Sequence, residues 1–168
     1  MFRQLLGYTT LLLSVVLSGC GGGDPVPPNS TVLISPPSIK WEISAKPTPC
    51  LVNSNVFIDH TIVISVLDTN NSPLGSVDIR VVTDLTGNTF SGGPVLNVYD
   101  DKNGNGVVDD PAELVSSNTS PAFMTATDRY TGTKTILLRV NLSCPYKGNL
   151  HVYAGAAYSN INIEVKTP

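Results

Sequence analysis

Charged side chains and histidines are scarce in this chain of 168 residues, and their scarcity limits what it can do. Asp, Glu, Lys and Arg together make up 14% of the sequence, and the formal charge is −3. Binding of nucleic acid needs a concentrated basic face, so no nucleic-acid partner is expected. His60 and His151 are the only histidines, neither lies in a nucleophile motif, and no G-x-S-x-G occurs. We therefore predict that the protein is not an enzyme.

Helical periodicity and internal repeats are also missing beyond Cys20. Gly contributes 14 residues and Pro 13, and Thr, Ser and Asn are frequent. This balance is typical of many short strands joined by turns rather than of helices. Apolar residues make up 41% of the chain, which is enough for one buried core. The composition alone predicts a single all-β domain.

An apolar stretch, Leu11–Leu17, follows one basic residue, Arg3, near the amino terminus. It is shorter than the run of about 20 apolar residues that a membrane-spanning helix needs, and the pattern is that of a secretory signal. The sequence Leu-Ser-Gly-Cys that ends at Cys20 resembles the lipobox of bacterial lipoproteins. The resemblance implies that residues 1–19 are a signal peptide and that Cys20 is acylated, which anchors a protein stably once two chains are attached. A plain signal peptide with an incidental cysteine is the alternative.

The segment after Cys20 predicts where the protein lies. Gly21 stands at the position where Asp is associated with retention in the inner membrane of enteric bacteria, so we expect a cell-envelope protein anchored in the outer membrane. Residues 20–30 are rich in Gly and Pro and form the predicted tether, which would span on the order of 30 Å at about 3.1 Å per residue. Loss of Arg3 leaves nine of the 10 basic residues against 13 acidic ones, a formal charge of −4.

Acylation of Cys20 would leave Cys50 and Cys144 as an even pair in an exported chain. We expect a disulfide between them. It would close a loop of roughly 95 residues, for which the chain-entropy treatment gives a stabilisation of about 4 to 5 kcal/mol. Two buried free thiols are the alternative. A cysteine metal site is not indicated, because neither residue has a second Cys or His at ligand spacing.

From residue 31 onward, apolar side chains alternate with polar ones, which is the period of a half-buried strand. The alternation is clearest in four runs: 61–68, 76–83, 135–142 and 161–165. The first two are joined by DTNNSPLG, a cluster of turn-forming residues. Seven or so strands separated by turns predict a β-sandwich. Trp41 lies in a predicted strand over 38–44 and is expected to pack in the core or at a sheet edge.

Residues 61–82, TIVISVLDTNNSPLGSVDIRVV, resemble the opening of bacterial immunoglobulin-like domains of the Big, invasin and intimin-like type. In those domains a strand ends in Asp and a Pro/Gly turn follows. Residues 131–143 and 148–166 resemble the closing strands. The resemblance implies an immunoglobulin-like antiparallel β-sandwich of about seven strands over residues 31–168. The chain departs from the family at 84–130, where the middle of the domain is expanded.

The expanded middle contains an acidic segment, residues 100–113, with the sequence DDKNGNGVVDDPAE. Counted from its second residue, oxygen-bearing side chains lie at alternate positions and a Gly follows the third of them, which is the front half of a calcium loop of the DxDxDG type. The expected side-chain ligands of this front half are Asp101, Asn103, Asn105 and Asp109.

The back half of the calcium pattern is incomplete. Val107 would contribute its carbonyl oxygen, but Ala112 stands where a bidentate carboxylate is expected. The closing carboxylate must then come from Asp110 or from Glu113. We predict a structural Ca²⁺ site here. An ordinary polar turn, with Gly104 and Gly106 supplying positive φ angles, is the alternative.

We expect the domain to act as an adhesin-like or scaffold module that contacts another envelope protein or a surface polymer through loops and strand edges. The alternative is a calcium-assisted carbohydrate-binding module, in which Tyr99, Tyr130 or Tyr153 stack on sugar faces. The placement of these tyrosines distinguishes the two hypotheses. Exposed rings that converge beside the acidic segment favour sugar, whereas dispersed or buried rings favour protein contact.

Overall fold

The computed structural model describes residues 25–43, 51–53, 55–84, 94–117 and 122–167. The predicted signal peptide, the predicted acylation site Cys20 and the predicted disulfide partner Cys50 lie outside these ranges. Within the described ranges, no helix is long and apolar enough to cross a bilayer.

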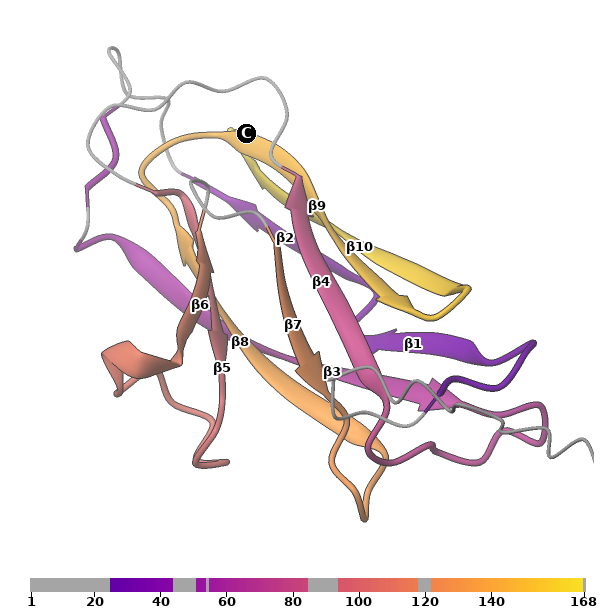
Figure 1. Cartoon of the computed structure of the whole chain (residues 1–168). Coiled ribbons are helices and arrows are strands. Elements are labelled where there is room, and N and C mark those ends of the chain that lie inside the picture. The colour runs from indigo at the N-terminus through magenta and orange to yellow at the C-terminus, as the bar shows by residue number, and fades with distance from the viewer. Residues whose placement is uncertain (1–24, 44–50, 54, 85–93, 118–121, 168) are drawn as a thin grey trace, which may run out of the picture.

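Ten strands form two sheets of five, stacked face to face (Figure 1). The order in the first sheet is β1 (Thr31–Ser35), β3 (Phe57–Leu67), β8 (Thr133–Asn141), β5 (Leu96–Asp100) and β6 (Leu114–Ser117). The order in the second is β2 (Ser38–Glu42), β10 (Ala157–Lys166), β9 (Tyr146–Ala154), β4 (Asp78–Asp84) and β7 (Ala122–Ala126). Neighbouring strands are antiparallel, except that β2 runs parallel to β10. The predicted all-β, immunoglobulin-like sandwich is confirmed, with ten strands in the described residues rather than about seven.

The alternation of apolar side chains identified the buried faces of the long strands. In β3, Ile62, Ile64 and Val66 are fully buried, and in β8 Ile136 and Leu138 are fully buried. The second sheet contributes the other half of the same cluster, chiefly Ile79, Val81, Leu150, Val152, Ile161 and Ile163. Burial of each such side chain contributes about 1.5 to 3 kcal/mol relative to exposure. The core therefore fixes the two sheets against each other, and their outer faces remain free for contacts with other molecules.

The expanded middle supplies three strands as well as loops. β5 and β6 pair with each other and extend the first sheet beyond β8. β7 pairs with β4 and forms an edge of the second sheet. The acidic segment lies between β5 and β6 and ends in a short 3-10 helix, η1 (Pro111–Glu113). The insertion thus places the acidic segment at the end of an edge hairpin.

Two residues with predicted packing roles lie in the described part of the chain. Cys144 is fully buried and forms a disulfide. Its pairing with Cys50 stays a prediction, because Cys50 lies outside the described residues. Trp41 is partly buried against the core, and its ring meets that of His60 edge-on with 5.7 Å between centroids. Trp41 is therefore a packing residue at a sheet edge, as predicted.

Candidate metal-binding loop

The β5–β6 hairpin brings the two ends of the acidic segment together. Asn97 lies opposite Ser117 and Tyr99 opposite Leu114, with a register shift just before Tyr99. Residues 101–113 close the hairpin and lie at the lower left of Figure 1. Because the sheet fixes both ends of the loop, its polar side chains are confined to a small volume.

Asp101 organises the first turn of the loop. The residue is buried, with 8% of its surface exposed. Oδ1 accepts a hydrogen bond from the backbone N of Asn105 at 3.1 Å, and Oδ2 accepts one from that of Gly106 at 3.1 Å. Gly106 has a φ of +72°, which side chains with a Cβ rarely adopt. The backbone therefore wraps around this carboxylate, as the glycine at this position of the pattern predicts.

The two asparagines and Asp109 continue the same network. Oδ1 of Asn103 accepts from the backbone N of Asn105 at 2.9 Å, and Oδ1 of Asn105 accepts from that of Val107 at 2.8 Å. The side-chain nitrogens of Asn103 and Asn105 donate to the two oxygens of Asp109, at 3.4 and 2.6 Å. Four of the predicted ligand residues thus converge. The carboxylate of Asp109 is therefore held by side-chain amide donors from the same loop.

Glu113 is the feature that hydrogen bonding within the loop does not explain. It is 1% exposed, and its Oε1 accepts from the backbone N of Lys102 at 3.2 Å. Its Oε2 is buried and has no hydrogen-bond partner among the described residues. Leaving a buried polar atom unsatisfied costs about 1 to 3 kcal/mol, and more if the group is charged. A buried carboxylate oxygen thus lies beside the start of the loop without a hydrogen-bond donor or cation to pair with.

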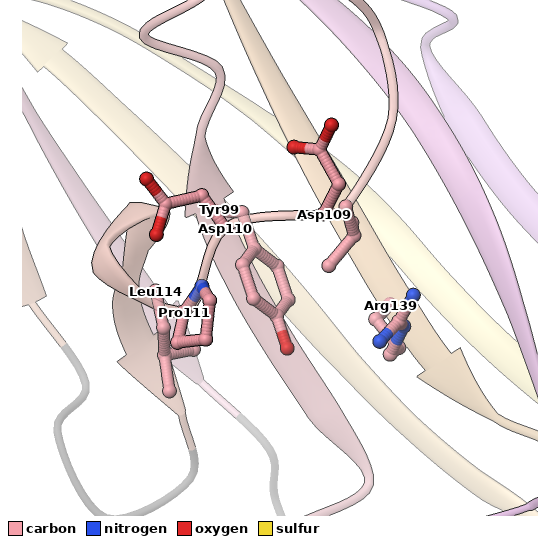
Figure 2. A pocket seen from close by; sticks show the side chains of 7 residues that line it. Tyr99, Asp109, Asp110, Pro111, Leu114 and Arg139 are labelled. Atoms are coloured by element: carbon pink, nitrogen blue, oxygen red, sulfur yellow. The ribbon is translucent and has the colours of Figure 1, made fainter.

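The structure separates the two candidates for the closing carboxylate. Oδ1 of Asp110 accepts from the backbone N of Ala112 at 2.8 Å and caps η1. Figure 2 shows the carboxylates of Asp109 and Asp110 apart from each other and pointing in different directions. Asp110 is therefore used as a helix cap, and Glu113 is the acidic residue turned inward. The side chain of Val107 is 54% exposed, so only its carbonyl is suited to face an ion.

The loop offers oxygen ligands of several kinds rather than a cluster of acids. Among the described residues, no three His, Cys, Asp or Glu side chains are grouped so that they could hold a metal ion by themselves. The set that converges here combines carboxylates with side-chain amides and a backbone carbonyl. Hard cations such as Ca²⁺ take this mixture, whereas softer transition metals prefer nitrogen and sulfur. In ligand type, the loop fits calcium.

A pocket of about 270 Å³ opens beside the loop, between Tyr99, Asp109, Leu114 and Arg139 (Figure 2). The guanidinium of Arg139 donates to both carboxylate oxygens of Asp59, at 2.7 and 2.8 Å. The hydrogen bond to Asp59 raises the pKa of Arg139 above its usual value. Arg139 is therefore already paired with an acid within the protein, and the pocket combines aromatic and aliphatic side chains with the carboxylates of Asp109 and Asp110.

Ion pairing at the start of the loop was not foreseen from the sequence. Asp100 forms an ion pair with Lys134 at the beginning of β8. It also accepts a hydrogen bond from the hydroxyl of Thr125 in β7, at 3.5 Å. Only the strand pairing reveals these contacts, since the three residues are distant in sequence. They connect the loop to both sheets.

The three tyrosines of the carbohydrate hypothesis do not converge on the loop. Tyr99 is 8% exposed, Tyr130 is 90% exposed in the turn between β7 and β8, and Tyr153 is 38% exposed in the other sheet. Because sugar stacking needs exposed rings that converge beside the loop, this dispersal favours protein contact over calcium-assisted sugar binding.

An acid, a histidine and a hydroxyl meet on the outer face of the second sheet, which the sequence did not predict. Nδ1 of His151 lies 2.8 Å from the hydroxyl of Tyr158, and Nε2 lies 4.0 Å from Oδ2 of Asp84. Tyr158 is 49% exposed. His151 does not line the pocket beside the loop, nor either of two others, which lie around Asp128 and around Arg80. The group lies on a sheet face outside those pockets, where strands β4, β9 and β10 bring it together.

No family model matches the chain, and no curated protein matches it. It is similar to part of a glycosyl hydrolase family 2 member from Bacteroides cellulosilyticus, with a TM-score of 0.45 and 12% identity over 86% of this chain. It is also similar to the ASH / PapD-like domain 7 of human CEP192, with a TM-score of 0.37 and 10% identity over 90% of this chain and 95% of that one. The chain spans only 15% of the length of the hydrolase. Both TM-scores are below 0.5, so neither likeness carries an argument about this chain, and its two-sheet β-sandwich rests on its own strand pairing.

Proposed function

We propose that this chain is a lipid-anchored protein of the cell envelope whose immunoglobulin-like domain works by contact and is stabilised by calcium in the loop 101–113. The lipobox-like sequence that ends at Cys20 supports the anchor, and Gly21 supports the outer membrane as its place. The partner is another envelope protein or a surface polymer. Exposed loops and edge strands on a rigid sandwich supply such contacts.

The buried Oε2 of Glu113 is the observation that carries the calcium proposal. A carboxylate oxygen without a hydrogen-bond partner is unfavourable in a buried position, and a bound cation removes that penalty. The ion would be held by Asp101, Asn103, Asn105, the Val107 carbonyl, Asp109 and Glu113. Binding would draw these groups together and displace the amide nitrogens that now donate to Asp109. The ion would supply positive charge and order, with no part in catalysis.

Contact rather than catalysis is supported by the surroundings of His151. A catalytic constellation needs a concave site that holds the reacting group next to the base. Here the histidine lies on a sheet face, and its two ring nitrogens are directed to Asp84 and Tyr158. These contacts tie three strands together on one face.

Thermal unfolding with calcium or with EDTA tests the proposal. At a calcium concentration 100 times the Kd, a ligand that binds only the folded state stabilises it by about 2.7 kcal/mol, which raises the Tm by several degrees. Asp101→Ala should abolish the rise. Asp110→Asn is the matched control: it removes a carboxylate from the same loop, but one that caps η1, and it should keep the rise. Identical melting curves in calcium and EDTA for the wild type would overturn the calcium site.

A further inference from the structure

The segment that leads into the domain lies against the second sheet. Val26 is partly buried and packs on the core. It also lies against Gly155, in the turn between β9 and β10, where an added Cβ would come within 3.0 Å of the Val26 Cβ. The Ser30 hydroxyl then donates to the Pro27 carbonyl at 2.8 Å, just before β1 begins. Residues 25–30 therefore belong to the domain rather than to a free tether.

This packing limits the distance between the domain and its anchor. Five peptide units separate Cys20 from Pro25, and a fully extended chain of that length spans at most about 18 Å. The value is well below the 30 Å or so that residues 20–30 would give if all of them were free. With Cys20 held at the bilayer surface, Pro25 and the residues around it lie close to the head groups.

An exposed row of side chains lies beside Pro25 on the outer face of the second sheet. Arg80 in β4 is opposite Tyr153 in β9 on one side and Met124 in β7 on the other, and Tyr153 is opposite Tyr158 in β10. Arg80, Met124, Tyr153 and Tyr158 are called the aromatic patch below. Met124 is 63% exposed and Tyr158 49% exposed. A pocket of about 440 Å³ separates part of the patch from Pro25 and Val26.

The chemistry of the aromatic patch suits the boundary between water and lipid. The two tyrosine rings lie 5.0 Å apart and present apolar bodies with polar tips, as interfacial aromatic residues do. Met124 adds a flexible apolar side chain, and Arg80 can bury its stem while its charge stays in water. Asp78 lines the same pocket as Arg80, so the local charge is nearly balanced. Protein interfaces share this composition, but the short reach from Cys20 favours the bilayer.

We propose that the aromatic patch contacts the bilayer surface and orients the domain there, with Met124, Tyr153 and Tyr158 in the head-group region. The inference rests on the acyl anchor of the proposed function. The anchor supplies the attachment, and the patch fixes which face of the sandwich meets the membrane. The opposite face and the far end of the strands are then turned toward the partner. Because the local charge is balanced, this membrane contact should depend little on the fraction of anionic lipid.

Hydroxyl-radical footprinting tests the membrane contact of the patch, on the full acylated chain in vesicles of phosphatidylethanolamine and phosphatidylglycerol. The Cys20→Ser chain in solution is the reference. Oxidation of Met124, Tyr153 and Tyr158 should be several-fold slower on vesicles. Phe57 is the matched reporter, because it is 43% exposed but lies at the start of β3 in the first sheet, opposite Asn141. Its oxidation rate should not change.

A double variant separates docking from mere proximity. Met124→Asp combined with Tyr158→Asp should leave the protein on floated vesicles but return Tyr153 to its solution rate of oxidation. The membrane contact would be overturned if the wild type floats without protection of the patch, or if protection survives the double variant. The patch would then be left to a protein or glycan partner. A wild-type chain that does not float with vesicles would overturn the acyl anchor, and with it the membrane contact of the patch.

Discussion

The loop 101–113 and the aromatic patch lie at the same end of the sandwich but are built in opposite ways. In the loop, side-chain oxygens are bonded to backbone amides of the same short segment, and the one unsatisfied atom, among those described, is buried in Glu113. In the patch, four strands each contribute one side chain, and three of these side chains carry large exposed apolar area. The loop is built to hold something inside the protein, and the patch to meet something outside it.

This difference predicts that the two regions can be separated by mutation. A change in the loop should alter stability and calcium response while leaving the membrane contact intact. A change in the patch should do the reverse. Only damage to the shared core should affect both.

The largest expected effect comes from the disulfide of Cys144. Loss of a native disulfide typically costs about 2 to 5 kcal/mol. Cys50→Ser, Cys144→Ser and the double variant should lose the same amount of unfolding free energy in denaturant titrations, because each removes one and the same bond. Costs that add in the double variant would show that Cys50 is not the partner. Calcium response and patch protection should both weaken, because the core supports both regions.

Glu113→Gln should have an effect whose sign depends on calcium. The amide keeps the acceptor for the Lys102 amide but removes the buried charge, so the calcium-free protein should gain about 1 to 3 kcal/mol or stay unchanged. In calcium the variant should be less stable than the wild type, because it lacks the charged ligand. Denaturant titrations in EDTA and in calcium measure both values. A variant that loses stability equally in the two buffers would contradict the assigned role.

Variants of the aromatic patch should hardly change stability. Met124→Ser alters an exposed side chain away from the core, so it should shift the unfolding free energy by no more than about 0.5 kcal/mol. Tyr158→Ser also removes the cross-strand contacts with His151 and Tyr153 and should cost up to about 1 kcal/mol. The calcium-induced rise in Tm should remain that of the wild type. A loss of the calcium response in these variants would show that loop and patch are one coupled unit.

The smallest expected effect is an acid transition in the turn between β7 and β8, which lies between the two regions. The backbone amides of Thr131 and Tyr130 donate to Asp128 and hold the pKa of its carboxyl below the ordinary value. Stability from these bonds is present above the pKa of the unfolded chain and is lost as the pH falls through the lower pKa of the folded protein. The amide shifts of both residues should therefore titrate together at acid pH. Asp128→Asn should remove the titration, and a transition that survives would assign it elsewhere.

The sequence predicted the features that depend on neighbours along the chain. Alternation in residues 61–68 gave the buried set of β3, because side-chain direction in a strand has a period of two. The ligand spacing from Asp101 to Asp109 predicted convergence, because a single tight turn produces it. The sequence left open whether Asp110 or Glu113 closes the loop, since that depends on which of them caps η1.

Features that depend on strand pairing were not predictable in the same way. The aromatic patch combines residues from 80 to 158, and the contacts of Asp100 with Thr125 and Lys134 join both sheets. The packing of Val26 on Gly155 was equally hidden, because a Gly- and Pro-rich segment reads as a spacer. Register between distant strands, rather than local pattern, creates these sites.

The measurement that tests the account most directly is a calcium titration of the Cys20→Ser chain followed by backbone amide shifts. We expect one saturable site, with large shifts at Lys102, Asn105 and Gly106 and little change at Tyr153. Amide shifts at Asn105 and Gly106 that stay constant up to millimolar calcium would contradict it.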